Sequence, residues 1–208
     1  MVNIKNILVG FLVSFIGSIP LGYLNIIGFQ LYEKMGLQPT ICYLLGVICI
    51  ELFVIYFTLI FAKKIAQNIS LIKYIEGFSV LFMFMLAAVF YFGSNSKTDY
   101  STRFNYLPFV LGIALSSLNF IQIPFWTGWN LYLLNGNYID VSKSRKYFYI
   151  SGTILGTFFG MLTLILSLSY FAANIVFVSR YLTKMIIPIV FLALGFFQFF
   201  KFYKKYNN

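Results

Sequence analysis

Apolar residues gather in long runs along the chain, and short polar or charged connections separate these runs. The runs cover residues 7–31, 41–62, 77–93, 107–134, 147–172 and 185–201. A helix that crosses the hydrocarbon core of a bilayer needs about 20 apolar residues, and every run approaches or exceeds that length. The pattern predicts an all-α membrane protein of about six transmembrane helices. Because no connection is long enough to separate soluble domains, we expect residues 1–208 to form a single integral membrane domain.

Composition removes other broad classes of protein. Hydrophobic residues make up 61% of the 208 residues and charged residues 10%, whereas globular domains have about 45–50% and about 25%. The chain has no histidine, and its two cysteines, Cys42 and Cys49, share one apolar run. Intramembrane enzymes need a reactive set such as serine with histidine, two membrane aspartates or a zinc-binding histidine pair. We therefore expect no enzyme, no metal site and no cofactor.

Basic residues outnumber acidic residues by 15 to 5, which gives a net charge of +10. They lie between apolar runs, where they hold loops at an anionic membrane surface, so we expect a lipid bilayer and no nucleic acid as partner. If both termini share a side with the second and fourth connections, that side holds ten of them: Lys5, Lys63, Lys64, Lys73, Lys143, Arg145, Lys146, Lys201, Lys204 and Lys205. The other side holds five: Lys34, Lys97, Arg103, Arg180 and Lys184. This bias predicts a multi-pass membrane protein with both termini in the cytoplasm.

Four short stretches recur in the same order in the second half of the chain. The pairs are residues 28–32 (GFQLY) with 128–132 (GWNLY) at an offset of 100, residues 43–48 with 149–154 at 106, Leu86, Ala87 and Phe90 with Leu192, Ala193 and Phe196 at 106, and Gly10, Ser14 and Gly17 with Gly112, Ser116 and Asn119 at 102. We interpret them as an internal duplication, with repeat 1 over residues 1–105 and repeat 2 over residues 106–208. Since each repeat holds three spans, an odd number, the second must enter the membrane from the opposite face. The sequence therefore predicts an inverted repeat.

Residues that interrupt helices stand inside the first run of each repeat. Residues 17–22 (GSIPLG) include Pro20, which lacks a backbone donor and clashes with the preceding turn, and residues 116–119 (SSLN) precede Pro124. Freed backbone groups need partners in a bilayer, and transporters built from inverted repeats bind substrate at such breaks near the midplane. Kinks used only for close packing are the alternative. The candidate substrate-binding residues of the two breaks are Ser18, Pro20, Gly22, Asn25, Asn119, Gln122 and Thr127.

Glu51 is an acidic residue inside an apolar run, about ten residues from either end of it. The other acids, which we place in connections, are Glu33, Glu76, Asp99 and Asp140. An ionised, unpaired carboxylate in hydrocarbon costs several kcal/mol, and no lysine or arginine stands in a span as a partner. Glu51 could therefore take a proton, a Na⁺ or a substrate ammonium, whereas a protonated carboxyl bonded to its surroundings is the structural alternative. We expect Glu51 to be both an ion-coupling and a substrate-binding residue.

The counterpart of Glu51 at the offset of 106 is Thr157, which joins the candidate substrate-binding residues. Thr157 lies among Gly152, Gly156 and Gly160, spaced one helical turn apart. Small residues at this spacing let helices approach closely in membranes. We interpret the glycines as a packing stripe, and we expect the two halves to differ chemically at the position of Glu51.

Several of these stretches resemble the LysE/RhtB family of amino-acid exporters, in the LysE superfamily. That family has about six spans, a proline- and glycine-rich break in the first helix, a glycine-bearing turn, a glycine-rich second helix and an Asn-Pro in the fourth. The matching stretches here are Pro20-Leu21-Gly22, Gly36, Gly46, Gly112 and Asn119-Phe120. The family's Pro-Gly-Pro is reduced to Pro20-Leu21-Gly22, and its Asn-Pro is replaced by Asn119-Phe120. The resemblance implies export of amino acids or related small metabolites across the bacterial inner membrane.

The residues and the resemblance together predict a secondary active transporter whose amino-acid export is coupled to an H⁺ or Na⁺ gradient. Two alternatives stay open. A non-transporting subunit would use its helices only to pack against a partner. An oligomeric ion channel would build a ring of carbonyls or charges that a single chain cannot reveal, and assembly into a homo-oligomer is likewise left open.

Overall fold

The computed structural model describes residues 2–19, 22–93, 107–174 and 187–206. The secondary structure of these residues is α-helical, which confirms the all-α prediction for the described part of the chain. The helices are α1 (Val2–Ser18), α2 (Tyr23–Met35), α3 (Leu37–Gln67), α4 (Ile69–Gly93), α5 (Leu107–Leu118), α6 (Gln122–Asn135), α7 (Arg145–Asn174) and α9 (Ile187–Tyr206). Glu76, expected in a connection, lies inside α4, which begins eight residues before the apolar run that predicted it.

Both predicted helix breaks are present. The axes of α1 and α2 differ by 76°, and those of α5 and α6 by 72°. Pro20, to which the first break was attributed, lies outside the described residues. Pro124 is in the first turn of α6. Backbone N–H groups in a first turn make no hydrogen bond within the helix, so the N–H that proline lacks is not needed there.

Two helices are individually long and apolar enough to cross a membrane, over Leu37–Ala62 of α3 and Arg145–Phe171 of α7. Each bent pair, α1 with α2 and α5 with α6, passes the same test when its two helices are taken together. The described residues therefore contain two to four candidate spans by length and composition, fewer than the six apolar runs.

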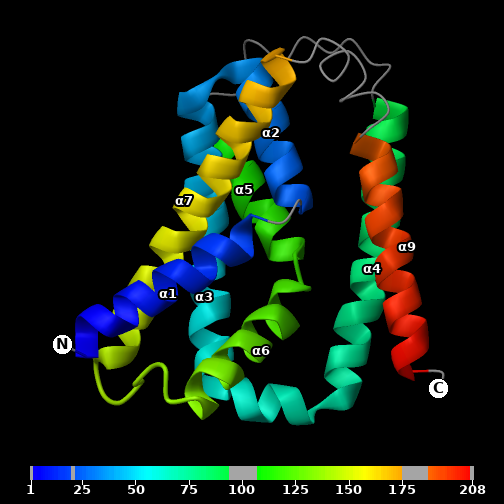
Figure 1. Ribbon diagram of the computed structural model, residues 1–208. Coiled ribbons are helices and arrows are strands. Elements are labelled where there is room, and N and C mark those ends of the chain that lie inside the picture. The colour runs from blue at the N-terminus through cyan, green and yellow to red at the C-terminus, as the bar shows by residue number, and fades with distance from the viewer. Residues whose placement is uncertain (1, 20–21, 94–106, 175–186, 207–208) are drawn as a thin grey trace.

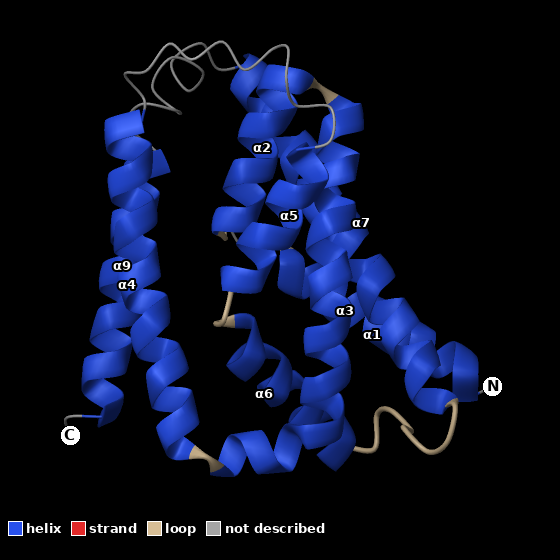
Figure 2. Ribbon diagram, turned by 180° about the vertical axis from the view of Figure 1, so that it is seen from behind, coloured by secondary structure: helices blue, strands red, loops and turns tan. Residues whose placement is uncertain are grey.

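The helices run between two ends of the molecule, and both breaks lie near mid-height (Figure 1). Both termini and the loop between α6 and α7 lie at the lower end of Figure 1, whereas the turn between α2 and α3 lies at the upper end. At that turn Gly36 has a φ of +82°, which a residue with a Cβ rarely adopts. Helices α1 and α5 begin at opposite ends, as do α3 and α7. Helices α4 and α9, which are far apart in the sequence, pack side by side (Figure 2).

Helix α1 packs along α7, and α5 packs along α3, so the closest contacts join opposite halves of the sequence. A Cβ at Gly10 of α1 would meet the carbonyl oxygen of Tyr149, and one at Gly112 of α5 would meet that of Tyr43. The two pairs are related by the offsets of 102 and 106 found in the sequence.

The reverse contacts follow the same offsets. A Cβ at Gly46 of α3 would meet the carbonyl oxygen of Phe109, and one at Gly152 of α7 would meet that of Ile7. Gly156 and Gly160 face backbone atoms of α1 in the same way. The glycines of α7 therefore pack against a neighbouring helix, which confirms their interpretation as a packing stripe.

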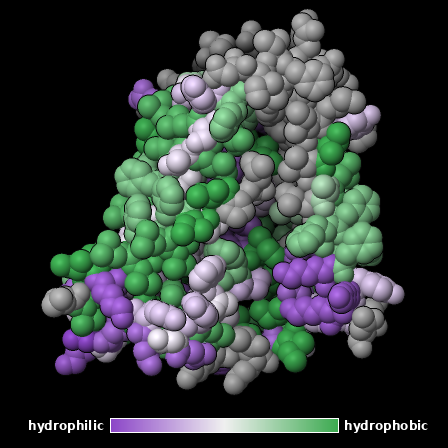
Figure 3. Space-filling model, viewed as in Figure 1, coloured by the Kyte–Doolittle hydropathy of each residue, from purple (hydrophilic) through white to green (hydrophobic). Residues whose placement is uncertain are grey.

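Two clusters of buried apolar side chains lie on either side of the mid-height region. The upper cluster consists of Tyr23, Leu24, Ile26, Ile27, Tyr43, Leu44, Val47, Phe82, Ala87, Met161 and Ile165. The lower cluster consists of Ile55, Leu59, Trp126, Leu133, Ile139, Tyr149 and Ile150. Along α3, Glu51 stands one helical turn from Val47 of the upper cluster and one from Ile55 of the lower cluster. Apolar side chains also cover much of the outer surface, while hydrophilic ones gather toward the lower end (Figure 3).

We expect Gly112→Ala to lower the free energy of unfolding by about 1–3 kcal/mol, because the added methyl group would press on the backbone of α3. Gly128→Ala in α6 is the matched control, since its Cβ would meet no atom within 4 Å and alanine favours a helix by about 0.5–1 kcal/mol. Thermal unfolding in detergent measures both. Equal melting temperatures for the two variants would contradict the close packing of α5 on α3.

Candidate functional site

The carboxyl group of Glu51 is held on one oxygen only. The indole N–H of Trp126, from α6, donates to Glu51 Oε1 at 3.1 Å. Glu51 Oε2 is buried, and among the described residues it has no hydrogen-bond partner. The ion pairs of the described chain join Arg145 to Asp140 and Lys205 to Glu76, and none involves Glu51. The carboxyl group therefore keeps one oxygen available for a proton or a cation.

Thr157 of α7 lies beside this carboxyl group. Its hydroxyl also shares a 2.5 Å hydrogen bond with the hydroxyl of Ser14 on α1. Thr157, which stands 106 positions after Glu51 in the sequence, is thus next to it in space. The centre of the molecule combines one carboxyl, one indole N–H and two hydroxyls, supplied by α3, α6, α7 and α1.

The amide side chains of the two breaks bond to the backbone. Asn25 Nδ2 donates to the carbonyl oxygen of Ser18 at 2.9 Å, and Gln122 Nε2 donates to that of Ser116 at 2.9 Å. Each amide thereby bonds to a carbonyl at the end of the preceding half-helix, where the helical backbone hydrogen bonds stop. The Ser116 carbonyl also accepts from the backbone N–H of Asn119 at 3.1 Å.

The other predicted break residues are placed as follows. Asn119 Oδ1 and Thr127 Oγ1 are buried and have no partner among the described residues. Gly22 precedes α2 with φ −91° and ψ 163°, an extended conformation open to any residue. Pro20 is outside the described residues. Within the described chain no hydrogen bond links Asn119, Gln122 or Thr127 to Glu51.

A second buried polar group, which is not among the predicted site residues, lies below Glu51. Asn130 of α6 donates from Nδ2 to Thr58 Oγ1 at 3.1 Å and accepts at Oδ1 from the Tyr149 hydroxyl at 2.8 Å. Both Asn130 and Tyr149 are 0% exposed. Both residues lie in stretches that recur in the sequence, 128–132 and 149–154, and this recurrence could have marked them as candidates.

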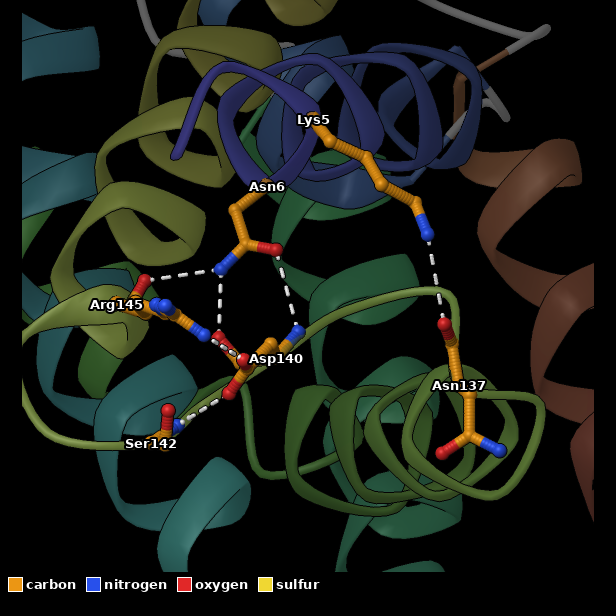
Figure 4. Close-up of polar contacts among 6 residues, drawn as sticks. All are labelled: Lys5, Asn6, Asn137, Asp140, Ser142 and Arg145. Atoms are coloured by element: carbon orange, nitrogen blue, oxygen red, sulfur yellow. Dashed lines mark hydrogen bonds and ion pairs between the residues drawn. The ribbon is translucent and has the colours of Figure 1, made fainter. Parts of the chain in front are cut away.

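A third polar group joins the start of α1 to the loop before α7 (Figure 4). Asn6, 0% exposed, donates from Nδ2 to the carbonyl oxygens of Asp140 at 2.7 Å and Arg145 at 3.1 Å. Its Oδ1 accepts from the backbone N–H of Asp140 at 3.2 Å. Asp140 also pairs with the Arg145 guanidinium and accepts at Oδ1 from the backbone N–H of Ser142 at 2.8 Å. The group fixes the loop to the lower ends of α1 and α7.

A surface hollow of about 460 Å³ is lined by Phe125, Gly128, Trp129 and Tyr132 of α6. These residues occupy a different face of α6 from Trp126 and Asn130, which point toward α3. Glu51 is not among the lining residues. The hollow and the carboxyl are therefore separate features of the described conformation.

Comparisons with protein-family models, with curated proteins and with solved structures found no match to this chain.

Hydrogen bonds from Ser142, and then the contact with Arg145, lower the pKa of Asp140 from 3.8 to about 2. Because the folded state holds the ionised form, Asp140 contributes stability above its ordinary pKa and loses that contribution as the pH falls through about 2. We expect Asp140→Asn to lose less stability than the wild type as the pH falls from about 4 to about 2, because the amide cannot be protonated in this range. Melting temperatures measured across this pH range test the expectation. Lys143→Gln, which alters a neighbouring exposed charge, should keep the wild-type acid profile, and an Asp140→Asn profile parallel to the wild type would contradict the assignment.

Proposed function

We propose that the protein is a secondary active transporter that exports amino acids or related small metabolites across the bacterial cytoplasmic membrane. The observation that carries the proposal is Glu51, a carboxyl with one oxygen that has no partner among the described residues, enclosed between two apolar clusters. A buried carboxyl without a fixed counter-ion has a use in a carrier, because it can gain and lose a proton or cation as access changes.

We further propose that the chain consists of two inverted three-helix repeats. In support, the reciprocal glycine contacts follow the sequence offsets of 102 and 106 on both sides. The corresponding helices α1 and α5 also begin at opposite ends. Transporters with this construction bind substrate near the midplane between the repeats.

The contacts of α2 and α6 favour aligning these two helices at an offset of 102. The identical residues in stretches 28–32 and 128–132 had indicated an offset of 100. A Cβ at Gly28 would lie 3.3 Å from the Tyr43 ring. The counterpart tyrosine, Tyr149, bonds to Asn130 rather than contacting Gly128. In the proposed repeat Asn130 therefore corresponds to Gly28.

In this proposal Glu51 couples transport to H⁺ or Na⁺ or receives the ammonium of the substrate. The half-helix that begins at Tyr23 lies with its N-terminus near mid-height, where a substrate carboxylate would be stabilised by the positive end of the helix dipole. The exposed lysines and both termini at the lower end support a cytoplasmic location for that end.

The test is gradient-driven efflux from proteoliposomes loaded with a panel of amino acids, under imposed H⁺ or Na⁺ gradients. Efflux of at least one amino acid that depends on one gradient is expected. Flux that follows only the substrate's own gradient would favour a channel, and no flux of any panel member from correctly inserted protein would contradict the proposal and favour a non-transporting subunit.

Glu51→Gln should insert and fold but lose gradient-driven efflux by about tenfold or more, because the amide keeps the size of the side chain and cannot exchange a proton or carry charge. Glu33→Gln is the matched control, since Glu33 is an exposed acid that bonds to Ser169 away from this centre. Efflux by Glu51→Gln at the wild-type rate would remove Glu51 from the mechanism.

A further inference from the structure

Five of the described helices form two packed bodies, each with members from both halves of the sequence. In the first, α1 and α7 are joined by the glycine contacts and by the hydrogen bond between Ser14 and Thr157. In the second, α3 and α5 are joined by the contacts of Gly46 and Gly112. Helix α6 belongs to the second body, because Trp126 and Asn130 both bond to side chains of α3.

Neither body can separate internally at low cost. The glycine contacts place backbone against backbone, and a buried side-chain hydrogen bond adds to each. Packed interiors tend to shift as units that hold discrete arrangements. Under the proposed transport function, the α1–α7 body and the α3–α5–α6 body would therefore move against each other as units.

Below Glu51, one buried hydrogen bond crosses from the first body to the second. The Tyr149 hydroxyl of α7 donates to Asn130 Oδ1 of α6 at 2.8 Å. The Asn130 amide is held from its other side by Thr58 of α3. Thr58 stands seven residues after Glu51, which is roughly 10 Å along the helix toward the lower end. The bond thus lies between the carboxyl and the lower surface, inside the lower cluster.

The corresponding position above Glu51 has no hydrogen bond between side chains of the two bodies in the described structure. Tyr43, the counterpart of Tyr149, donates to the backbone carbonyl of Leu24 at 3.0 Å. Gly28, the counterpart of Asn130, has no side chain and faces Ile165. The upper contact between α2 and α7 is therefore apolar, whereas the lower contact between the bodies contains a specific pair of polar side chains.

We infer that the Tyr149–Asn130 hydrogen bond is the lock that closes the path between Glu51 and the lower end of the molecule. This inference rests on the proposed function, since it assigns the lower gate of the same carrier. Removal of the tyrosine hydroxyl releases the two bodies at this point and leaves the ring, the glycine contacts and the upper cluster in place. A net hydrogen bond of ordinary strength shifts such an opening equilibrium by about 3- to 10-fold.

The test measures how fast a cysteine in each apolar cluster reacts with a small, permanently charged methanethiosulfonate reagent in detergent. Ile55→Cys reports on the lower cluster and Ile165→Cys on the upper cluster, and both native residues are 0% exposed. Cys42 and Cys49 are replaced by serine in every protein. Tyr149→Phe is compared with Tyr43→Phe, its repeat counterpart, which loses a hydroxyl that bonds only to backbone in the described structure.

We expect Tyr149→Phe to raise the reaction rate of Ile55→Cys about 3- to 10-fold and to leave that of Ile165→Cys unchanged. Tyr43→Phe should not raise the rate of Ile55→Cys. Asn130→Leu removes the acceptor of the same hydrogen bond and should have the same effect. It serves as the second variant if Tyr149→Phe folds poorly. An unchanged Ile55→Cys rate in folded Tyr149→Phe or Asn130→Leu, or an equal rise with Tyr43→Phe, would overturn the lock.

The result is separable from the transport test. Labelling needs no substrate and no gradient, so a lock that responds as expected in a protein without efflux would contradict the proposed function alone. Glu51-dependent efflux combined with unchanged labelling would contradict the lock alone.

Discussion

The approach of α1 to α7 and of α5 to α3, backbone against backbone, constrains the rest of this structure. Helices in a membrane gain little from apolar contact that lipid does not also offer, so their association depends on close packing and on hydrogen bonds between them. Glycine at Gly10, Gly46, Gly112 and Gly152 allows that approach at four related positions. Because each contact joins opposite halves of the chain, residues of both halves meet around Glu51.

That meeting explains how the molecule tolerates Glu51. The carboxyl would be costly against lipid, but here the indole of Trp126 and the hydroxyl of Thr157 lie beside it, and apolar clusters enclose it from above and below. The environment stabilises the group without neutralising it by an ion pair. A role in packing alone does not explain why the enclosed centre contains Glu51, a carboxyl with one oxygen that lacks a hydrogen-bond partner among the described residues.

Local patterns predicted the helices, both breaks and the packing role of Gly152, Gly156 and Gly160, because composition and glycine or proline content act over a few residues. Partners distant in sequence were not predictable. Trp126 and Glu51 are 75 residues apart, and Asn6 and Asp140 are 134 apart, and nothing local indicates either pair. The contacts of Asn25 and Gln122 with backbone carbonyls beside their own breaks were likewise not indicated by the sequence.

The opposite orientation of the two halves is the central claim, and the sidedness of two single cysteines tests it most directly. Gln38→Cys, beside the α2–α3 turn, and Lys143→Cys, in the α6–α7 loop, are placed separately in a chain whose native cysteines are serine, and are labelled with an impermeant maleimide in sealed vesicles of known orientation. The account predicts labelling of Lys143→Cys from the cytoplasmic side and of Gln38→Cys from the other side. Labelling of both residues from the same side would contradict it.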